Sequence, residues 1–373
     1  PLRIGILLRN RHDGPGGLEK VLEIVVKELK GRPVELFFYA LYPPKYQQFT
    51  DGFSHLSVLA LPKPLAFLEE HLPKNLSRLV RKSYVRLCGR KLFDEMIKDR
   101  IDLLITMDLS KQFLTNYSFL KQFKEACKIP LISWVHSSLS SNSKEVERAV
   151  KEKIALFDGH LAISTGIAKE IEEIYQGRNV TVIYNPVEEA ELVKRDKSKF
   201  LYIGRIDENK RVTSLLTQLK KLKGNWSLDI YGSTGNQDKD LEFQNSIKSL
   251  GLEDRVTFHG WKRDVWAEID SAGIILLNSR REGLPLVLVE AMMRGIPALS
   301  SDCPTGPADI IIHGKNGWLY PVDDESSITL ILQKVIDSEL ILPESISVQE
   351  SVSKYRFDHY FTAIYNALSK IIK

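Results

Sequence analysis

Short runs of apolar, β-branched residues alternate with stretches of helical periodicity throughout the chain of 373 residues. A strand followed by a helix and another strand predicts parallel βαβ units, because parallel neighbours need a crossover connection. The sequence therefore predicts the α/β class rather than a sandwich or a bundle. The expected strands lie at residues 3–8, 103–106, 130–136, 160–164, 180–184, 200–204, 228–231, 256–259, 274–277, 298–300 and 318–320.

The length exceeds what one hydrophobic core usually holds, so two domains are expected. Pro186 forces extended geometry on the residue before it, which favours a boundary there. We expect an N-terminal domain at 1–185, a second domain at 186–350, and a helical segment at 351–373 that returns to the first domain. Open parallel sheets bind ligands at the carboxyl ends of their strands, so function should concentrate in those loops, beside a cleft shared by two facing sheets.

Two carboxylates, Glu282 and Glu290, bracket a glycine, a proline and an apolar helical run. Pro285 suits the first position of a helix, and Gly295 suits its end. Unpaired N–H groups at a helix start carry partial positive charge and attract phosphate. The spacing puts one acid in the loop and the other about one turn into the helix, so both reach hydroxyls around that phosphate. A nucleotide-sugar site needs this arrangement.

Two further features follow expected first strands. Gly16 and Gly17 end a glycine-rich loop that opens a helix, where backbone N–H groups can approach a phosphate or sugar, although such a loop is also an ordinary turn. Gly204 and Arg205 close the first strand of the second domain, and Lys210 opens the next helix. These two cations either neutralise a diphosphate or cap a loop.

His136 stands at the end of an apolar strand. A histidine there can bond a sugar hydroxyl, orient a reacting group or serve the fold alone. Asp238 and Asp240 have the spacing of a metal-binding D-x-D, but they begin an expected helix, where acids are favoured by the helix dipole. We expect neither a metal ion nor a cofactor, and the absence of G-x-G-x-x-G argues against a nicotinamide enzyme.

Charge and cysteine content limit the kinds of binding partner and the cellular compartment that we expect for the chain. The net charge of +4 is too small to indicate a nucleic-acid protein, and three cysteines in no regular spacing predict a reducing cytoplasm. The segment 74–91 nevertheless holds seven basic residues and no acid, with apolar residues at helical spacing. It is either a solvated face over a core stripe or a surface that docks on anionic lipid headgroups. Its basic residues are Lys74, Arg78, Arg81, Lys82, Arg86, Arg90 and Lys91, and its apolar residues are Leu76, Leu79, Val80, Tyr84, Leu87 and Cys88.

Together these residues resemble a retaining glycosyltransferase of glycosyltransferase family 4, which has the GT-B fold of two Rossmann-like domains. The resemblance covers nearly the whole chain and rests above all on the family's E-x7-E motif between Glu282 and Glu290. The segment 303–317 is similar to the lipopolysaccharide-core galactosyl- and glucosyltransferases, with Asp309 where many members carry Glu. The other residues that carry the likeness are Gly16, Gly17, Leu18, Glu19, His136, Tyr184, Asn185, Pro186, Val187, Gly204, Arg205 and Lys210.

The resemblance implies catalytic roles for Glu282, His136, Arg205 and Lys210. Glu282 and the backbone after it would hold the hydroxyls of the donor sugar, Glu290 the ribose, and His136 the sugar near its anomeric centre. Arg205 and Lys210 would bind the diphosphate, and the base would lie near Trp261 and Lys262. The implied donor-binding residues are Gly16, Gly17, Gly204, Trp261, Lys262, Gly283, Leu284, Pro285, Leu286 and Glu290.

The resemblance favours a cytoplasmic enzyme, possible also at the inner face of a membrane, that moves glucose or galactose from a UDP-sugar to a glycan, lipid-linked or protein-linked acceptor. It also implies a front-face displacement in which a donor phosphate oxygen takes the acceptor proton. The alternatives are a GDP-sugar or UDP-N-acetylhexosamine donor, an epimerase or phosphorylase on the same fold, and a non-catalytic partner subunit. No nucleic acid is expected.

Overall fold

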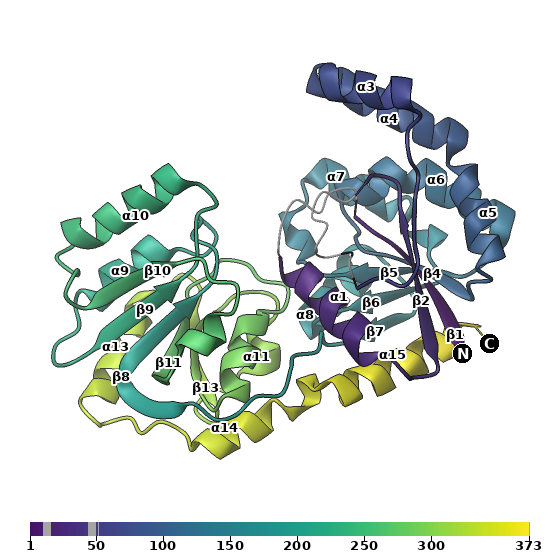
Figure 1. Cartoon of the computed structure of the whole chain (residues 1–373). Coiled ribbons are helices and arrows are strands. Elements are labelled where there is room, and N and C mark those ends of the chain that lie inside the picture. The colour runs from purple at the N-terminus through teal and green to yellow at the C-terminus, as the bar shows by residue number, and fades with distance from the viewer. Residues whose placement is uncertain (10–15, 44–49, 51, 373) are drawn as a thin grey trace. The chain divides into compact units, whose positions relative to one another are not determined.

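The computed structural model describes residues 1–9, 16–43, 50 and 52–372. The chain divides into two compact units. Unit 1 comprises Pro1–Pro186 and Tyr360–Lys373, and unit 2 comprises Val187–His359. Each unit contains one parallel sheet covered by helices (Figure 1). In the part of the chain that is described, no helix is both long and apolar enough to cross a membrane.

The sheet of unit 1 has seven parallel strands in the order β3-β2-β1-β4-β5-β6-β7. The sequence did not predict β2 or β3, and β3 is only three residues long. All carboxyl ends lie at one edge, because Leu7 pairs with Thr106 and Thr106 pairs with Ser133. The strands are β1 (Leu2–Leu7), β2 (Val34–Ala40), β3 (Leu56–Val58), β4 (Leu103–Thr106), β5 (Leu131–Val135), β6 (Gly159–Ala162) and β7 (Val180–Val182).

The longer helices of unit 1 are α1 (Gly17–Glu28), α3 (Lys63–His71), α4 (Lys74–Cys88), α5 (Arg90–Lys98), α6 (Lys111–Cys127), α7 (Lys144–Lys151) and α8 (Thr165–Lys169). The helical spacing expected through the segment 74–91 is interrupted, because Gly89 separates α4 from α5. A Cβ at Gly89 would stand 2.8 Å from the ring of Phe119 on α6. Only glycine lets the chain pass α6 at this distance.

The sheet of unit 2 has six parallel strands in the order β10-β9-β8-β11-β12-β13. Gly232, at a φ of +158°, follows β9, and a Cβ there would lie 1.8 Å from the carbonyl oxygen of Gly204 after β8. The two strand ends can touch only because position 232 is glycine. The strands are β8 (Lys194–Ile203), β9 (Ser227–Tyr231), β10 (Val256–Gly260), β11 (Ser271–Leu277), β12 (Ala298–Asp302) and β13 (Gly317–Pro321).

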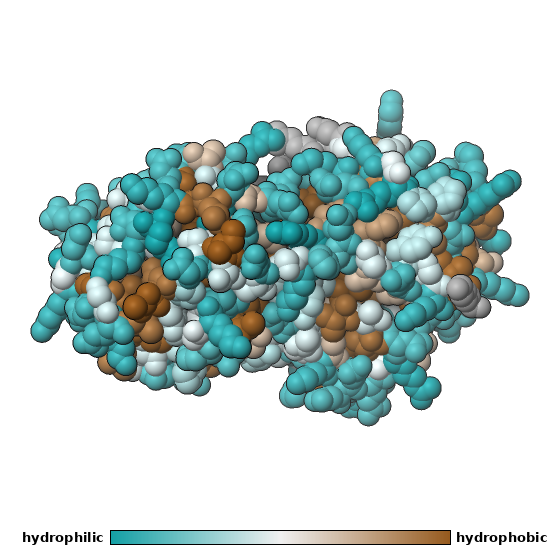
Figure 2. Space-filling view, turned by 90° about the horizontal axis from the view of Figure 1, so that it is seen from below, coloured by the Kyte–Doolittle hydropathy of each residue, from teal (hydrophilic) through white to brown (hydrophobic). Residues whose placement is uncertain are grey.

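Helices cover this second sheet and one helix leaves the unit. Helix α15 (Phe357–Ile372) begins in unit 2, while its residues from Tyr360 onward belong to unit 1, where Leu368 is fully buried. Hydrophilic side chains predominate on the face seen in Figure 2, with apolar side chains in separate patches. The helices of unit 2 are α9 (Val212–Leu219), α10 (Gln237–Ser249), α11 (Leu286–Met293), α12 (Pro307–Ile310), α13 (Ser326–Ile336) and α14 (Ser345–Ser351).

Candidate active site

The loop that carries Glu282 is held in place before helix α11. The helix begins at Leu286, so Pro285 is its N-cap and not its first residue as predicted. Gly306 has a φ of +95°, and a Cβ there would meet the Pro285 ring at 2.6 Å. The Thr305 hydroxyl donates a hydrogen bond to the Glu282 carbonyl. The loop after β12 therefore packs against the loop before α11 and fixes the path of its backbone.

Glu282 forms an ion pair with Lys210. Lys210 Nζ lies 2.5 Å from Glu282 Oε1, and the side chains are only 15% and 10% exposed. Lys210 is positioned by a turn in which its N–H donates to Asp207 Oδ1 at 3.0 Å. The two loops are also tied by Asn209, whose Nδ2 donates to the Arg281 carbonyl at 2.9 Å. The sequence predicts both residues in loops at the carboxyl edge of the second sheet. In the structure their side chains form an ion pair.

A second ion pair beside the first was not predicted. Arg211 Nη1 lies 2.8 Å from Glu325 Oε1, and the Arg211 Nε donates to the Asn278 carbonyl at 2.8 Å. Tyr320 donates its hydroxyl to Asn278 Oδ1 at 2.8 Å. These contacts occupy Arg211 within the protein, so it ties α9 to the sheet. Since Arg211 and Glu325 are far apart in the chain, no local pattern indicates their pairing.

Arg205 stands apart from this network. Its side chain is 80% exposed, and its nearest acid is Asp207, at 3.7 Å from Nη2. Exposed pairs at this distance contribute little to stability. Gly204, just before it, donates its N–H to the Tyr231 carbonyl at 3.0 Å. The Arg205 backbone therefore lies at the carboxyl edge of the sheet, while its side chain is exposed and only weakly paired.

Glu290 accepts a hydrogen bond from a residue that the sequence did not single out. Trp266 Nε1 donates to Glu290 Oε2 at 2.9 Å, and the guanidinium of Arg294 lies 4.2 Å from the centre of the Trp266 ring. Burial lowers the pKa of Arg294, while Glu290 counteracts this. Trp266 lies in the short helix η4 (Val265–Glu268), where nothing in the sequence marks it.

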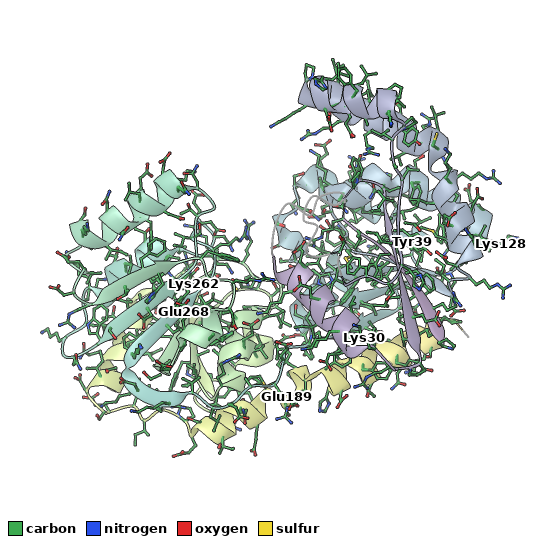
Figure 3. The ribbon with its side chains drawn as sticks, in the orientation of Figure 1. Lys30, Tyr39, Lys128, Glu189, Lys262 and Glu268 are labelled. Atoms are coloured by element: carbon green, nitrogen blue, oxygen red, sulfur yellow. The ribbon has the colours of Figure 1, made fainter. Side chains whose placement is uncertain are left out.

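The residues predicted to lie near the base are on the neighbouring loop. Trp261 is 57% exposed. Lys262 and Glu268 lie side by side, as Figure 3 shows, with 3.2 Å between Nζ and Oε1. This loop therefore exposes the Trp261 side chain, and its Lys262 is paired with Glu268 of η4, the short helix that also carries Trp266.

In unit 1, His136 follows β5 and is enclosed. Its Nδ1 lies 3.4 Å from Asn185 Nδ2, and its ring centre is 4.3 Å from that of Trp134. Its Nε2 is buried and has no hydrogen-bond partner among the described residues. Burial, and secondarily the charge of Arg9, hold the pKa of His136 well below its usual value, so the ring is neutral.

Two residues near His136 were missed by the sequence analysis. Arg9 comes two residues after β1, and its buried Nε lacks a partner within the described ranges. Asp108 comes two residues after β4 and accepts a hydrogen bond from Ser110. Burial raises the pKa of Asp108, and Ser110 and Arg9 oppose that rise. Both residues follow apolar strands, so the strand-end rule that selected His136 would also have selected them.

Gly17 is the first residue of α1 and is exposed. A Cβ at Gly17 would meet no atom of the described residues within 4 Å, whereas one at Gly16 would stand 2.6 Å from Glu19 Oε2. Protein packing therefore does not require glycine at position 17. Residues 12–15 of the predicted loop lie outside the described residues.

The D-x-D pair serves the start of α10. Asn236 caps this helix by accepting from the Lys239 N–H at 3.1 Å, and Asp240 accepts from the Ser233 hydroxyl and the Thr234 N–H, each at 2.7 Å. In the described ranges, no group of three or more His, Cys, Asp or Glu side chains could hold a metal ion.

Comparison with known proteins identifies relatives of both units. Residues 186–350 match the family described as glycosyl transferases group 1. The chain is 33% identical over 261 residues to a lipopolysaccharide 1,6-galactosyltransferase of Escherichia coli, a match that covers 67% of this chain and 69% of that protein. It is 32% identical over 294 residues to the enzyme of the same description from Salmonella typhimurium, covering 74% and 79%.

Solved structures agree. The apo form of the lipopolysaccharide outer core galactosyltransferase WaaB aligns with a TM-score of 0.78 at 26% identity, over 99% of both chains. HepE of Anabaena in complex with UDP and glucose aligns with a TM-score of 0.74 over 99% of this chain and all of that one, and its 18% identity supports the fold alone. The predicted GT-B fold of two Rossmann-like domains is confirmed. The chain belongs to the group 1 glycosyltransferases and is a transferase enzyme.

Proposed function

We propose that this enzyme is a retaining member of glycosyltransferase family 4 that transfers glucose or galactose from a UDP-sugar to a cell-surface glycan on a glycan, lipid or protein carrier. The lipopolysaccharide galactosyltransferases to which the chain is similar support this proposal. The observation that carries it is the Lys210–Glu282 ion pair next to the start of α11. The three cysteines are free thiols, which suits a reducing cytoplasm.

In this proposal the donor diphosphate binds at the carboxyl edge of the unit 2 sheet. Lys210 already lies against Glu282, so it can contact a phosphate oxygen while it keeps that partner. Arg205, exposed and weakly paired, turns toward the same anion. The N-terminal end of α11 adds further positive potential through its helix dipole, and a metal ion is not required for charge balance in this proposal.

The Glu282 carboxylate is proposed to accept hydrogen bonds from the sugar hydroxyls. The backbone from Gly283 to Leu286 is proposed to donate N–H groups to the same hydroxyls, except at Pro285, which has none. Glu290 has one oxygen engaged by Trp266 and is proposed to take a ribose hydroxyl. The aromatic face of Trp261 and the Lys262 side chain are proposed to contact the base. Gly204 leaves room at the end of β8 for the diphosphate.

The proposed reaction is a front-face displacement. The bond between the anomeric carbon and the phosphate oxygen breaks, and the bond to the acceptor oxygen forms on the same face of the sugar. The electron pair of the broken bond leaves with UDP. The acceptor proton passes to an oxygen of the departing phosphate. Lys210 and Arg205 stabilise the charge that develops there, which is the largest contribution a site of this kind makes.

Unit 1 is proposed to supply hydroxyl-binding groups. The neutral His136 ring and the Arg9 Nε–H have unsatisfied hydrogen-bonding capacity, and the Asn185 Oδ1 is an unsatisfied acceptor. A sugar presents hydroxyls that both donate and accept, so it can satisfy all three. Gly16 and Gly17 are proposed to let a phosphate or sugar approach the start of α1, where a Cβ at Gly17 would meet no atom of the described residues within 4 Å.

A donor screen tests this proposal. The thermal midpoint is measured with UDP-, GDP- and ADP-linked glucose and galactose and with UDP-N-acetylhexosamines, and a ligand at 100 times its Kd should stabilise by about 2.7 kcal/mol. UDP-glucose or UDP-galactose should give the largest shift, and NMR of the product should show the anomeric configuration of the donor. A shift with GDP-sugars alone, an inverted product, or an epimer in place of a glycoside would overturn it.

A further inference from the structure

The helix pair α3 and α4 exposes large apolar side chains. Phe67 and Leu68 on α3 are 60% and 42% exposed, and Leu76, Leu79 and Leu87 on α4 are 49%, 59% and 80% exposed. The sequence allowed these leucines to be an ordinary core stripe. The structure contradicts that reading for the three leucines, which are exposed, whereas Tyr84 of the same expected stripe is buried. Figure 1 shows the two helices lying side by side and extending beyond the helices that cover the sheet of unit 1.

A row of basic residues runs beside these leucines. Arg78, Lys82 and Arg86 are exposed and lie four residues apart on α4. At about 100° per residue, Arg86 lies within about 20° of Leu79 around the helix axis, and Lys82 within about 60°. The leucine stripe and the basic stripe are therefore adjacent on α4, with Leu79 and Arg86 at their shared edge, while Arg78 lies about 180° from Leu87 around the axis. Helix α4 contains no acidic residue, and of the two glutamates on α3 only Glu70 is exposed.

One basic residue of the segment does not belong to this surface. Arg81 is buried, and its Nε and Nη2 donate to the two carboxylate oxygens of Glu69 at 3.0 and 3.1 Å. Its Nη1 donates to the Leu59 carbonyl at 3.0 Å, and the Tyr84 hydroxyl donates to the Ala60 carbonyl, also at 3.0 Å. These contacts hold the opposite side of α4 against α3 and residues 59–60. The leucines and the outer cations are thereby kept facing outward.

We propose that the outer face of α3 and α4 docks on a bilayer that contains anionic lipids. Apolar side chains beside a row of cations match the boundary between acyl chains and headgroups. There the leucines can contact acyl chains and the cations can contact anionic headgroups. A nucleic acid would neutralise the cations but leave the leucines in water. The surface is made within unit 1, so the inference does not depend on which sugar the enzyme transfers.

Vesicle sedimentation with the full chain tests the proposal. The enzyme should bind vesicles of phosphatidylcholine with 30% phosphatidylglycerol at low salt and bind pure phosphatidylcholine far less. The variant R78Q/K82Q/R86Q should lose on the order of 100-fold in partitioning, since each cation near the surface contributes about 1 kcal/mol. The variant L79Q/L87Q should lose on the order of 10-fold or more, and the remaining binding should disappear at high salt.

The matched control is L330Q/I341Q, which removes two exposed apolar side chains of unit 2, at 62% and 85% exposure. It should bind vesicles as the natural chain does, and no variant should change the melting temperature. Failure to bind anionic vesicles at low salt would overturn the proposal, as would equal losses in L79Q/L87Q and the control. So would a dimer, seen by sedimentation velocity, that L79Q/L87Q disperses without any change in vesicle binding. Transfer to a soluble acceptor, measured alongside, separates these outcomes from a failure of the proposed reaction.

Discussion

The candidate site residues of the two units differ in whether their polar groups already have partners. In unit 2 the predicted site residues already have partners in the protein: Lys210 with Glu282, Lys262 with Glu268, and Glu290 with Trp266. In unit 1, by contrast, the His136 Nε2 and Asn185 Oδ1 are buried without a partner among the described residues. The Arg9 Nε is in the same condition.

This difference indicates two ways in which a site can be organised before its ligand binds. Paired charges hold a site rigid at little cost, and an arriving anion shares partners that are already in place. Buried polar atoms without partners cost stability, and a ligand that satisfies them returns that cost as binding free energy. Substitutions in unit 2 should therefore damage stability and activity together, whereas substitutions in unit 1 should separate the two.

Lys210→Met should have the largest effect. It leaves the Glu282 carboxylate, 10% exposed, without its cation, which should lower the free energy of unfolding by about 3 kcal/mol. It also removes a cation from the proposed diphosphate site, so kcat/KM should fall about 1000-fold. Urea unfolding and steady-state transfer assays measure the two effects.

The double variant K210M/E282Q sharpens this test. Because it removes the unpaired charge, it should recover most of the lost stability but none of the activity. The control is Lys144→Met, in a pair with Glu147 whose lysine is 93% exposed, and it should leave the stability essentially unchanged. If K210M transferred sugar at the natural rate, the assignment of Lys210 to the donor site would be wrong.

His136→Phe should show the contrasting behaviour of unit 1. It removes the buried Nε2, which has no partner among the described residues, together with the long 3.4 Å contact between Nδ1 and Asn185, so the free energy of unfolding should change by less than about 1 kcal/mol. Transfer should nevertheless fall about 100-fold, because a group that binds or orients the reacting sugar is lost. His136→Gln should restore part of the rate by supplying a hydrogen-bonding group. A loss of stability with full activity would make the histidine structural and remove the contrast.

The sequence predicted features that depend on local pattern. The apolar runs located strands such as β4 and β11, and the rule that ligands bind at strand ends selected Glu282, Lys210 and His136. It could not predict contacts between segments that are distant in the chain. Trp266 reaches Glu290 across 24 residues, and Arg211 reaches Glu325 across more than 100. A periodic pattern also cannot say whether a stripe is covered, which is why Leu79 was compatible with a core position until its neighbours were known.

The pH dependence of stability gives the smallest expected effect and tests the burial of polar groups in unit 1 independently of activity. His160 is 1% exposed, its Nδ1 lies 2.7 Å from the Ser133 hydroxyl, and burial lowers its pKa from 6.5 to about 4. Because the unfolded chain binds a proton at higher pH than the folded chain, stability is present above pH 6.5 and is lost as pH falls toward 4. Between pH 7 and 5 this histidine should cost unit 1 about 2 kcal/mol.

Hydrogen exchange on peptides from β6 and from β9 reports the two units separately. The loss between pH 7 and 5 should be smaller by about 2 kcal/mol in His160→Asn than in the natural chain for β6. The β9 peptide should respond equally in both proteins, because His160 belongs to unit 1. The control variant His313→Gln removes an exposed histidine of unit 2 and should leave the β6 response unchanged. If β6 showed the same pH response in His160→Asn and in the natural chain, protonation of this histidine would not oppose folding. The contrast in burial between the units would then rest on His136 and its neighbours.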